Sequence, residues 1–274
     1  MKIAVCFKIT ADYSRLSEED WTWDEGHFVD TGFVRRIFNC YDESALEMAL
    51  NLSNPSEKCL EKDELTALTV DDPKSDLFLK HLMALGYDPA VRIQCDSNID
   101  LRFNPSAVSS LISTYIRQEG QQLVLFGIQG GDGDNCQTGP LVAEQLEWPC
   151  IREVTGVDRT KDPDCLKVYS RIDTATLIQT VKLPVVLTIG QSLDAPYLRF
   201  PNLKQKLTAK KKQVTLLSNN ELGLNADTLI NNCITLVGLE RPGTKQSCIF
   251  LNASGTQKQA RHLYDHYLKD RVFP

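Results

Sequence analysis

The chain has 274 residues, of which 42% are hydrophobic and 24% are charged. This balance is typical of a folded globular protein, and the length allows one large α/β domain with an extension or two small domains. The net charge of −6 provides no basic excess for nucleic acid or anionic lipid, so we expect a small-molecule or protein partner and no nucleic acid.

The nine cysteines are scattered along the chain, are odd in number and include no CxxC pair. This pattern disfavours a secreted disulfide framework and a zinc site, so we expect a reducing compartment and no metal. No apolar run approaches the roughly 18 residues of a membrane span. We therefore expect a cytoplasmic protein without membrane insertion, or a mitochondrial-matrix protein if the source is eukaryotic, although no transit peptide is visible.

The first half of the chain contains four short apolar runs of the kind found in parallel strands, which are buried on both faces. These runs are residues 2–8, 65–70, 90–93 and 123–127. Helical patterns lie between them, at residues 43–52, at residues 76–85 closed by Gly86, and in a segment that begins at Asn104-Pro105. Alternating strands and helices predict an α/β fold with a doubly wound, mostly parallel sheet.

After about residue 150 the pattern changes. Residues 165–169 and 176–182 are predicted to form a pair of exposed strands, and residues 183–189 a buried one. Residues 194–212 carry six lysines or arginines and little apolar periodicity, which predicts an extended arm rather than core. Residues 260–268 have the pattern of an amphipathic helix that docks on this chain or on a partner.

The glycine-rich segment GIQGGDGDNCQTGP, residues 127–140, directly follows a predicted strand and precedes a predicted helix at 141–146. Ligands of open α/β sheets bind beyond the carboxyl ends of the strands. Glycines let the backbone approach a ligand closely, and free N–H groups at a helix N-terminus can bind phosphate. Asp132 and Asp134 could accept hydrogen bonds from ribose hydroxyls or could only fix the turn. The segment predicts a nucleotide site.

A phosphate loop of an ATP-using ligase or pyrophosphatase is one alternative for this segment. Such a loop usually follows the first strand and contains a serine, whereas this segment follows a late strand. A small residue packed in a turn explains Cys136 better than a redox thiol does.

The segment from Gly127 through Trp148-Pro149 closely resembles the nucleotide-binding signature of electron transfer flavoprotein beta subunits. Further similarities to this family follow in the same order: residues 2–8, NCYDE at 39–43, ALGYD at 84–88, LPVV at 183–186, DAPY at 194–197 and Pro201-Asn202. The resemblance extends over roughly residues 1–215. Two departures are Asp71, where many members have glycine, and Phe200, where the family has leucine.

The resemblance implies the beta subunit of a heterodimeric electron transfer flavoprotein, with an adenine-nucleotide-binding α/β domain. Such a subunit is an electron carrier and not an enzyme with a catalytic residue of its own. It carries electrons through FAD shared with an alpha subunit, and it binds AMP or, in electron-bifurcating members, a second FAD. The implied partners are the alpha subunit and a client dehydrogenase, for example of the acyl-CoA dehydrogenase type. The alternative is a stand-alone adenine-nucleotide-binding stress or signalling module, although such modules tend to be shorter and lack the arm.

The resemblance also implies roles for individual residues. Tyr13 would lie near the flavin held by the alpha subunit, and Tyr197, Phe200 and Pro201 would dock the client dehydrogenase. Residues 1–192 would form the nucleotide-binding domain, and residues 193–274 the recognition arm and an extension that wraps the partner subunit. The nucleotide would be lined by Cys6, Asn39, Cys40, Tyr41, Asp42, Val70, Gly130, Gly131, Asp132, Gly133, Asp134, Asn135, Cys136, Gln137, Thr138, Gly139, Pro140 and Leu141.

Overall fold

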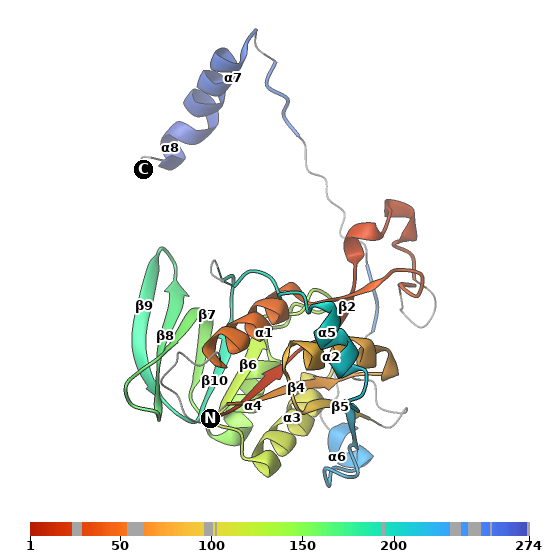
Figure 1. The fold of residues 1–274 in the computed structure, drawn as a ribbon. Helices are drawn as coiled ribbons and strands as arrows, with labels where there is room; N and C mark the ends of the chain where they lie inside the picture. Colours follow the sequence, from red (N-terminus) through yellow and green to blue (C-terminus); the bar gives the residue numbers. More distant parts are fainter. Residues whose placement is uncertain are drawn as a thin grey trace. The chain divides into compact units, whose positions relative to one another are not determined.

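The computed structural model describes residues 1–23, 29–53, 63–95, 101, 103–192, 195–230, 237–240, 248–252 and 254–272. The chain divides into two compact units, Met1–Val237 and Gly238–Pro274. The first unit contains the sheet and the helices that cover it (Figure 1). Within the described residues, no helix is long and apolar enough to cross a membrane.

The first unit is built on a nine-stranded sheet with the strand order β11-β5-β4-β1-β6-β10-β7-β8-β9. Every neighbouring pair from β11 to β7 is parallel, and β7, β8 and β9 continue as antiparallel neighbours. The strands are β1 (Lys2–Cys6), β4 (Glu64–Val70), β5 (Ala90–Gln94), β6 (Leu123–Gly127), β7 (Cys150–Arg159), β8 (Cys165–Ile172), β9 (Ala175–Lys182), β10 (Val185–Ile189) and β11 (Thr215–Ser218). This architecture confirms the predicted α/β fold with a mostly parallel sheet.

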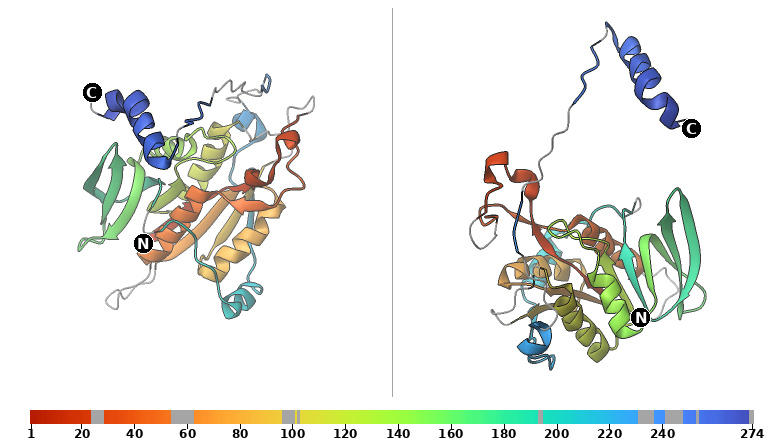
Figure 2. Two further views of the ribbon diagram at one scale, coloured as in Figure 1. Left: turned by 90° about the horizontal axis from the view of Figure 1, so that it is seen from above. Right: turned by 180° about the vertical axis from the view of Figure 1, so that it is seen from behind.

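Helices cover both faces of the sheet (Figures 1 and 2). On one face Ile3 and Val5 of β1 share a core with α1 (Cys40–Ser53) and α2 (Asp76–Leu85). On the other face Ala4 and Cys6 share a core with α3 (Pro105–Glu119) and α4 (Thr138–Leu146). Because side chains of a strand alternate between faces, the continuous apolar run of β1 fills both layers.

The helix ends follow from local chemistry. Asn104 caps α3 by accepting the N–H of Ala107 at 3.0 Å, and Pro105 occupies the first turn. Gly86, at φ 115°, ends α2 in the left-handed region that glycine adopts without strain. Both ends were predicted from the sequence and are confirmed.

The segment after β10 is only partly the extended arm that we expected. Residues Leu203–Ala209 form helix α5, whose first turn carries a capping box between Asn202 and Gln205. Leu198 and Ala209 belong to the main core, and α5 packs on α2. The expectation of an arm without core residues is therefore wrong, because isolated apolar side chains alternate here with charged ones too irregularly to show a period.

Several elements carried no clear sequence signal. Strand β7 is a mixture of half-buried and exposed positions, and β11 is a short edge strand paired with β5. The first unit also contains the antiparallel pair β2 (Ile9–Ala11) and β3 (Arg36–Phe38), the short helix α6 (Ala226–Ile230) and three 3₁₀ turns (Tyr13–Arg15, Glu18–Asp20 and Pro73–Ser75) among its described residues.

The second unit contains the predicted amphipathic helix. It is formed by α7 (Thr256–Leu263), a π-helical turn (Tyr264–Leu268) and α8 (Lys269–Val272). In α7 and the π-helical turn no side chain is buried within the part of the chain that the structure describes. The apolar face of this helix is thus left without a core of its own.

Candidate functional site

A pocket of about 610 Å³ lies at the carboxyl ends of the central parallel strands. Among the strands of the nine-stranded sheet, β4 comes next in the chain after β1 and lies on one side of it, while the chain later crosses to β6 on its other side. This reversal is the topological switch point, where open α/β sheets bind ligands. The pocket is lined by residues at the ends of β1, β4, β5 and β6, by the first half of α3 and by the first turn of α4.

The buried carboxylate of Asp42, in the first turn of α1, holds the floor of the pocket together. Its Oδ2 accepts the main-chain N–H of Lys8 at 2.8 Å, and its Oδ1 accepts that of Gly127 at 2.9 Å. One side chain therefore satisfies a main-chain donor just after β1 and another at the last residue of β6. Burial raises the pKa of Asp42 to about 7, although the two N–H bonds oppose this shift.

Gly127 has to be glycine because the backbone at the start of α1 lies directly against it. A Cβ built at this position would lie 2.8 Å from the backbone N of Asp42 and 2.8 Å from the carbonyl carbon of Tyr41. Both neighbours are main-chain atoms, so they cannot rotate away as a side chain would. The absence of a Cβ is what allows α1 to begin directly against the end of β6.

The glycine-rich loop after β6 is fixed by hydrogen bonds within the chain. The Nδ2 of Asn39 donates to the carbonyl of Gln129 at 2.8 Å, and the carbonyl of Gly130 accepts the N–H of Asp134 at 2.9 Å. Asp134 and Cys136 have φ angles of 45° and 53°, in the left-handed region that costs non-glycine residues free energy. This strained backbone turns the loop around one side of the pocket.

Helix α4 begins at the pocket with its N-terminal donors free of a side-chain cap, as judged from the described residues. Thr138 and Gly139 are its first residues, and both line the pocket. Free N–H groups at a helix N-terminus attract an anion. Gly139 also has a packing role, since a Cβ there would meet Cγ2 of Thr188 at 2.7 Å, a group in the core and not a ligand.

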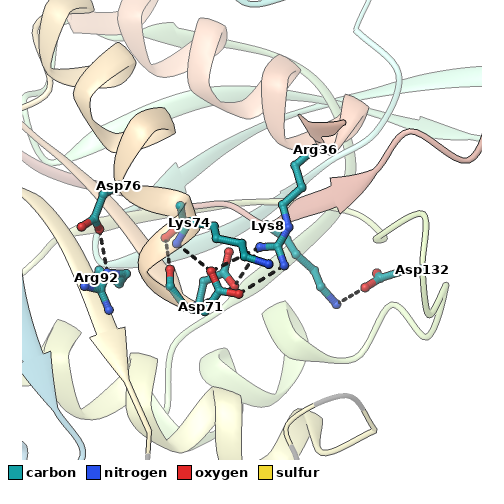
Figure 3. A network of polar contacts seen from close by, with 9 residues as sticks. Lys8, Arg36, Asp71, Lys74, Asp76, Arg92 and Asp132 are labelled. Carbon is teal, nitrogen blue, oxygen red and sulfur yellow. Dashed lines mark hydrogen bonds and ion pairs between the residues drawn. The ribbon is translucent and has the colours of Figure 1, made fainter. Parts of the chain in front are cut away.

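Charged side chains form the rim of the pocket (Figure 3). The Nζ of Lys8 lies 2.7 Å from Oδ2 of Asp132, so this pair joins the end of β1 to the glycine-rich loop. Arg36, also on the rim, contacts Asp72 at 3.2 Å and lies 3.9 Å from Asp71. Both pairs are partly exposed, so each contributes little stability but defines the charge around the opening.

The inner wall of the pocket is largely apolar. It is formed by Cys6, Val70, Leu101, Val108 and Ile112. Burial raises the pKa of the Cys6 thiol, and the neighbouring Asp42 raises it further. Cys6 is therefore a neutral, packed side chain, and the wall suits a flat aromatic ring.

The structure brings most of the residues expected at the nucleotide into this one pocket. Cys40, Tyr41, Gly131, Pro140 and Leu141 lie beside the pocket lining in the chain but do not belong to it. The expected residues that line the pocket are Cys6, Asn39, Asp42, Val70, Gly130, Asp132, Gly133, Asp134, Asn135, Cys136, Gln137, Thr138 and Gly139.

Tyr13 lies outside the pocket lining, in a 3₁₀ turn (Tyr13–Arg15), and stacks on Trp21 with ring centroids 5.9 Å apart. Burial raises the pKa of Tyr13, and the charge of Asp132 adds to the shift. The tyrosine therefore lies on the same side of the molecule as the glycine-rich loop.

Several pocket residues were not predicted. They come from the ends of β1 and β4, from β3, and from α3 and the segment before it, where a single polar or apolar side chain leaves no pattern. Lys8 ends the apolar run 2–8 and Asp71 directly follows the run 65–70, so position at the end of a predicted parallel strand was the one signal available for both. The missed residues include Lys8, Arg36, Asp71, Leu101, Val108 and Ile112.

The three residues expected to dock a client lie near α5. Tyr197 is 76% exposed and Phe200 is 88% exposed, whereas Pro201 is buried. The segment between them is anchored to α1, because Arg199 donates its main-chain N–H and its Nε to the carboxylate of Glu47 at 3.0 and 2.8 Å. The two aromatic side chains are thus held outward on a fixed backbone.

Most of the chain is similar to known proteins of one family. The family model described as "Electron transfer flavoprotein domain" matches residues 29–222. The electron transfer flavoprotein subunit beta of Bacillus subtilis is 30% identical over 83% of this chain and 82% of its own length. The human protein of the same name is 29% identical over 78% of this chain and 79% of its own length. The Methylophilus methylotrophus protein of that name is also 29% identical, over 83% of this chain and 83% of its own length.

Proposed function

Because the chain belongs to the electron transfer flavoprotein family, and its relatives include beta subunits from bacteria and human, we propose that it is the beta subunit of a heterodimeric electron carrier. In this role it passes electrons through FAD between dehydrogenases and other redox partners. It holds AMP in the pocket at the switch point, or a second FAD if the complex bifurcates electrons. The observation that carries the proposal is the pocket enclosed by the glycine-rich loop and the start of α4.

The pocket suits an adenine nucleotide on two grounds. The N–H groups at the start of α4 can bind a phosphate, and the apolar inner wall, which includes Val70 and Ile112, can hold a base. Gly131 and Gly133 leave the loop backbone open, because no heavy atom of the described residues lies within 4 Å of a Cβ built at either position. The residues present therefore fit the nucleotide.

A flavin bound by the complex supplies the redox chemistry, since its ring accepts and donates electrons. This chain's own residues bind and orient. Asp42 fixes the ends of β1 and β6, and the first turn of α4 neutralises phosphate charge. Tyr13 and Trp21 offer an aromatic surface near the loop for the flavin side of the alpha subunit.

Two surfaces support partner binding. The helix of the second unit presents Leu263, Tyr264 and Leu268 with no buried side chain of its own in the described residues, which suits an alpha subunit that covers it. Tyr197 and Phe200 form an exposed aromatic pair on an anchored segment, which suits a client dehydrogenase, because aromatic anchors dominate small interfaces.

Co-expression with an alpha subunit tests the proposal. We expect a yellow 1:1 complex, from which heat releases one adenine nucleotide per heterodimer besides the shared FAD. Filling the pocket with Val108→Trp should reduce the released nucleotide sharply, whereas Gln118→Trp, on an exposed turn of the same helix, should leave it unchanged. A colourless chain that stays monomeric in the presence of alpha subunits would refute the assignment.

A further inference from the structure

One carboxylate oxygen in the pocket has no partner within the described part of the chain. Asp71 follows β4 and lines the pocket. Its Oδ1 accepts the main-chain N–H of Asp72 at 2.8 Å, but its Oδ2 is buried and makes no hydrogen bond. A buried polar atom without a partner is costly and uncommon in folded proteins. Within the described part of the chain, Oδ2 of Asp71 therefore has no hydrogen-bond donor.

The nearby cations are engaged elsewhere. Lys8 pairs with Asp132 at 2.7 Å, and the guanidinium of Arg36 makes its short contact with Asp72 at 3.2 Å. Arg36 lies 3.9 Å from Oδ1 of Asp71, which is beyond hydrogen-bond distance. Figure 3 shows Asp71 and Arg36 beside the Lys8–Asp132 pair. Burial raises the pKa of Asp71, and the charge of Asp72 adds to the shift, so neither cation compensates the group fully.

The position of Asp71 indicates which part of a nucleotide would supply the donor. The N-terminus of α4, which attracts phosphate, follows β6, while Asp71 follows β4, and β1 lies between these strands. Two strand spacings are on the order of 10 Å. This separation leaves room for a sugar between the phosphate and the carboxylate. In dinucleotide-binding folds an acidic residue accepts hydrogen bonds from the ribose hydroxyl, and its charge repels a phosphate.

From this arrangement we propose that Oδ2 of Asp71 binds the ribose hydroxyls of the nucleotide in this pocket and selects an unmodified 2′,3′-diol over ribose that is phosphorylated or lacks a hydroxyl. This inference rests on the proposed nucleotide site. It adds a specificity-determining contact on the β4 side of the pocket, opposite the glycine-rich loop.

Binding of AMP analogues to the heterodimer stripped of its adenine nucleotide tests the contact. Calorimetric titration should show that wild type binds AMP at least about 10-fold more tightly than 2′-deoxy- or 3′-deoxy-AMP, as expected for a hydrogen bond to a charged group. The wild-type heterodimer should also fail to bind adenosine 3′,5′-bisphosphate. If the pocket of the purified heterodimer contains FAD instead of AMP, the ligands compared are FAD and its 2′-deoxyadenosine analogue.

Variants separate the contact from a general effect on the pocket. Asp71→Asn keeps an oxygen for the N–H of Asp72 but places an amide donor at the position of Oδ2, so the preference for the diol should fall to threefold or less. Asp76→Asn removes an equivalent charge beside Arg92, at a residue that does not line the pocket, so the full preference should remain. The thermal midpoints of both variants establish that they are folded.

The other outcomes overturn the inference. Equal wild-type affinities for AMP and its deoxy analogues would show that Asp71 does not contact the ribose. Loss of binding with inosine monophosphate, without any effect of the deoxy analogues, would show that the acceptor faces the amino group of adenine. If wild type binds neither AMP nor FAD in this pocket, the proposed nucleotide site fails as well, whereas the first two outcomes leave it intact.

Discussion

Oδ1 of Asp42 accepts the main-chain N–H of Gly127 at 2.9 Å, so a side chain from α1 closes the carboxyl end of β6. The same carboxylate bonds the N–H of Lys8 beyond β1. The two strands that flank the switch point are therefore joined through one buried acidic group. Stability, pH response and ligand binding should all depend on it.

Asp42→Asn removes the titrating group at nearly constant size. Burial raises the pKa of Asp42 to about 7, so the native state holds this proton more tightly than the unfolded chain, whose pKa is about 4. Wild type should therefore lose stability as pH rises from about 4 to 7, with no further loss above, and the variant lacks this step. Denaturant unfolding at several pH values gives the free energy of unfolding of wild type and variant. Between pH 4 and 7 the wild-type value minus the variant value should fall by up to about 4 kcal/mol. A difference that stays constant with pH would contradict the raised pKa.

Gly127→Ala should destabilise the protein by about 1–3 kcal/mol or more, because the added Cβ is forced against main-chain atoms of Asp42 and Tyr41. Gly131→Ala is the matched control, since no heavy atom of the described residues lies within 4 Å of a Cβ at that position. The midpoints of urea unfolding give the comparison. Equal midpoints for the two variants would show that α1 can shift away from β6 at no cost.

Phe200→Ala should leave the thermal midpoint nearly unchanged, because the side chain is 88% exposed. Transfer to the client dehydrogenase should weaken by about 1–3 kcal/mol of docking free energy if Phe200 is the anchor. Leu198→Ala, two residues earlier and buried, should instead lower stability by about 2–5 kcal/mol. Normal electron transfer by folded Phe200→Ala protein would remove Phe200 from the docking surface.

Glu47→Ala should release the docking segment from α1. Glu47 accepts both the main-chain N–H and the guanidinium of Arg199, and hydrogen bonds to charged groups contribute about 1.5–3 kcal/mol. We expect a loss of stability of that order together with weaker docking of the client. Glu64→Ala, which removes an exposed partner of Lys2 at 3.9 Å, should cost less than about 1 kcal/mol. Equal losses in the two variants would show that Arg199 does not anchor the segment.

The sequence alone predicted the α/β class, because apolar runs of four to seven residues separated by amphipathic segments have few other folded solutions. It also located the glycine-rich loop after β6, since a loop in that position lies at the ligand-binding edge of a parallel sheet whatever the details of packing. Caps such as Asn104 and Gly86 were predictable because they act within one helical turn.

Only the tertiary structure showed how distant segments meet. Asp42 and Gly127 are 85 positions apart in the chain, and nothing in either local sequence indicates that one bonds the other. Gly139 was expected to face a ligand, yet the space at its Cβ position is filled by Thr188 of β10. The free oxygen of Asp71 and the outward turn of Phe200 beside the buried Leu198 are likewise decided by burial. Local sequence fixes backbone preference and periodicity, whereas burial and pairing of single side chains depend on contacts that form only when the whole sheet has assembled.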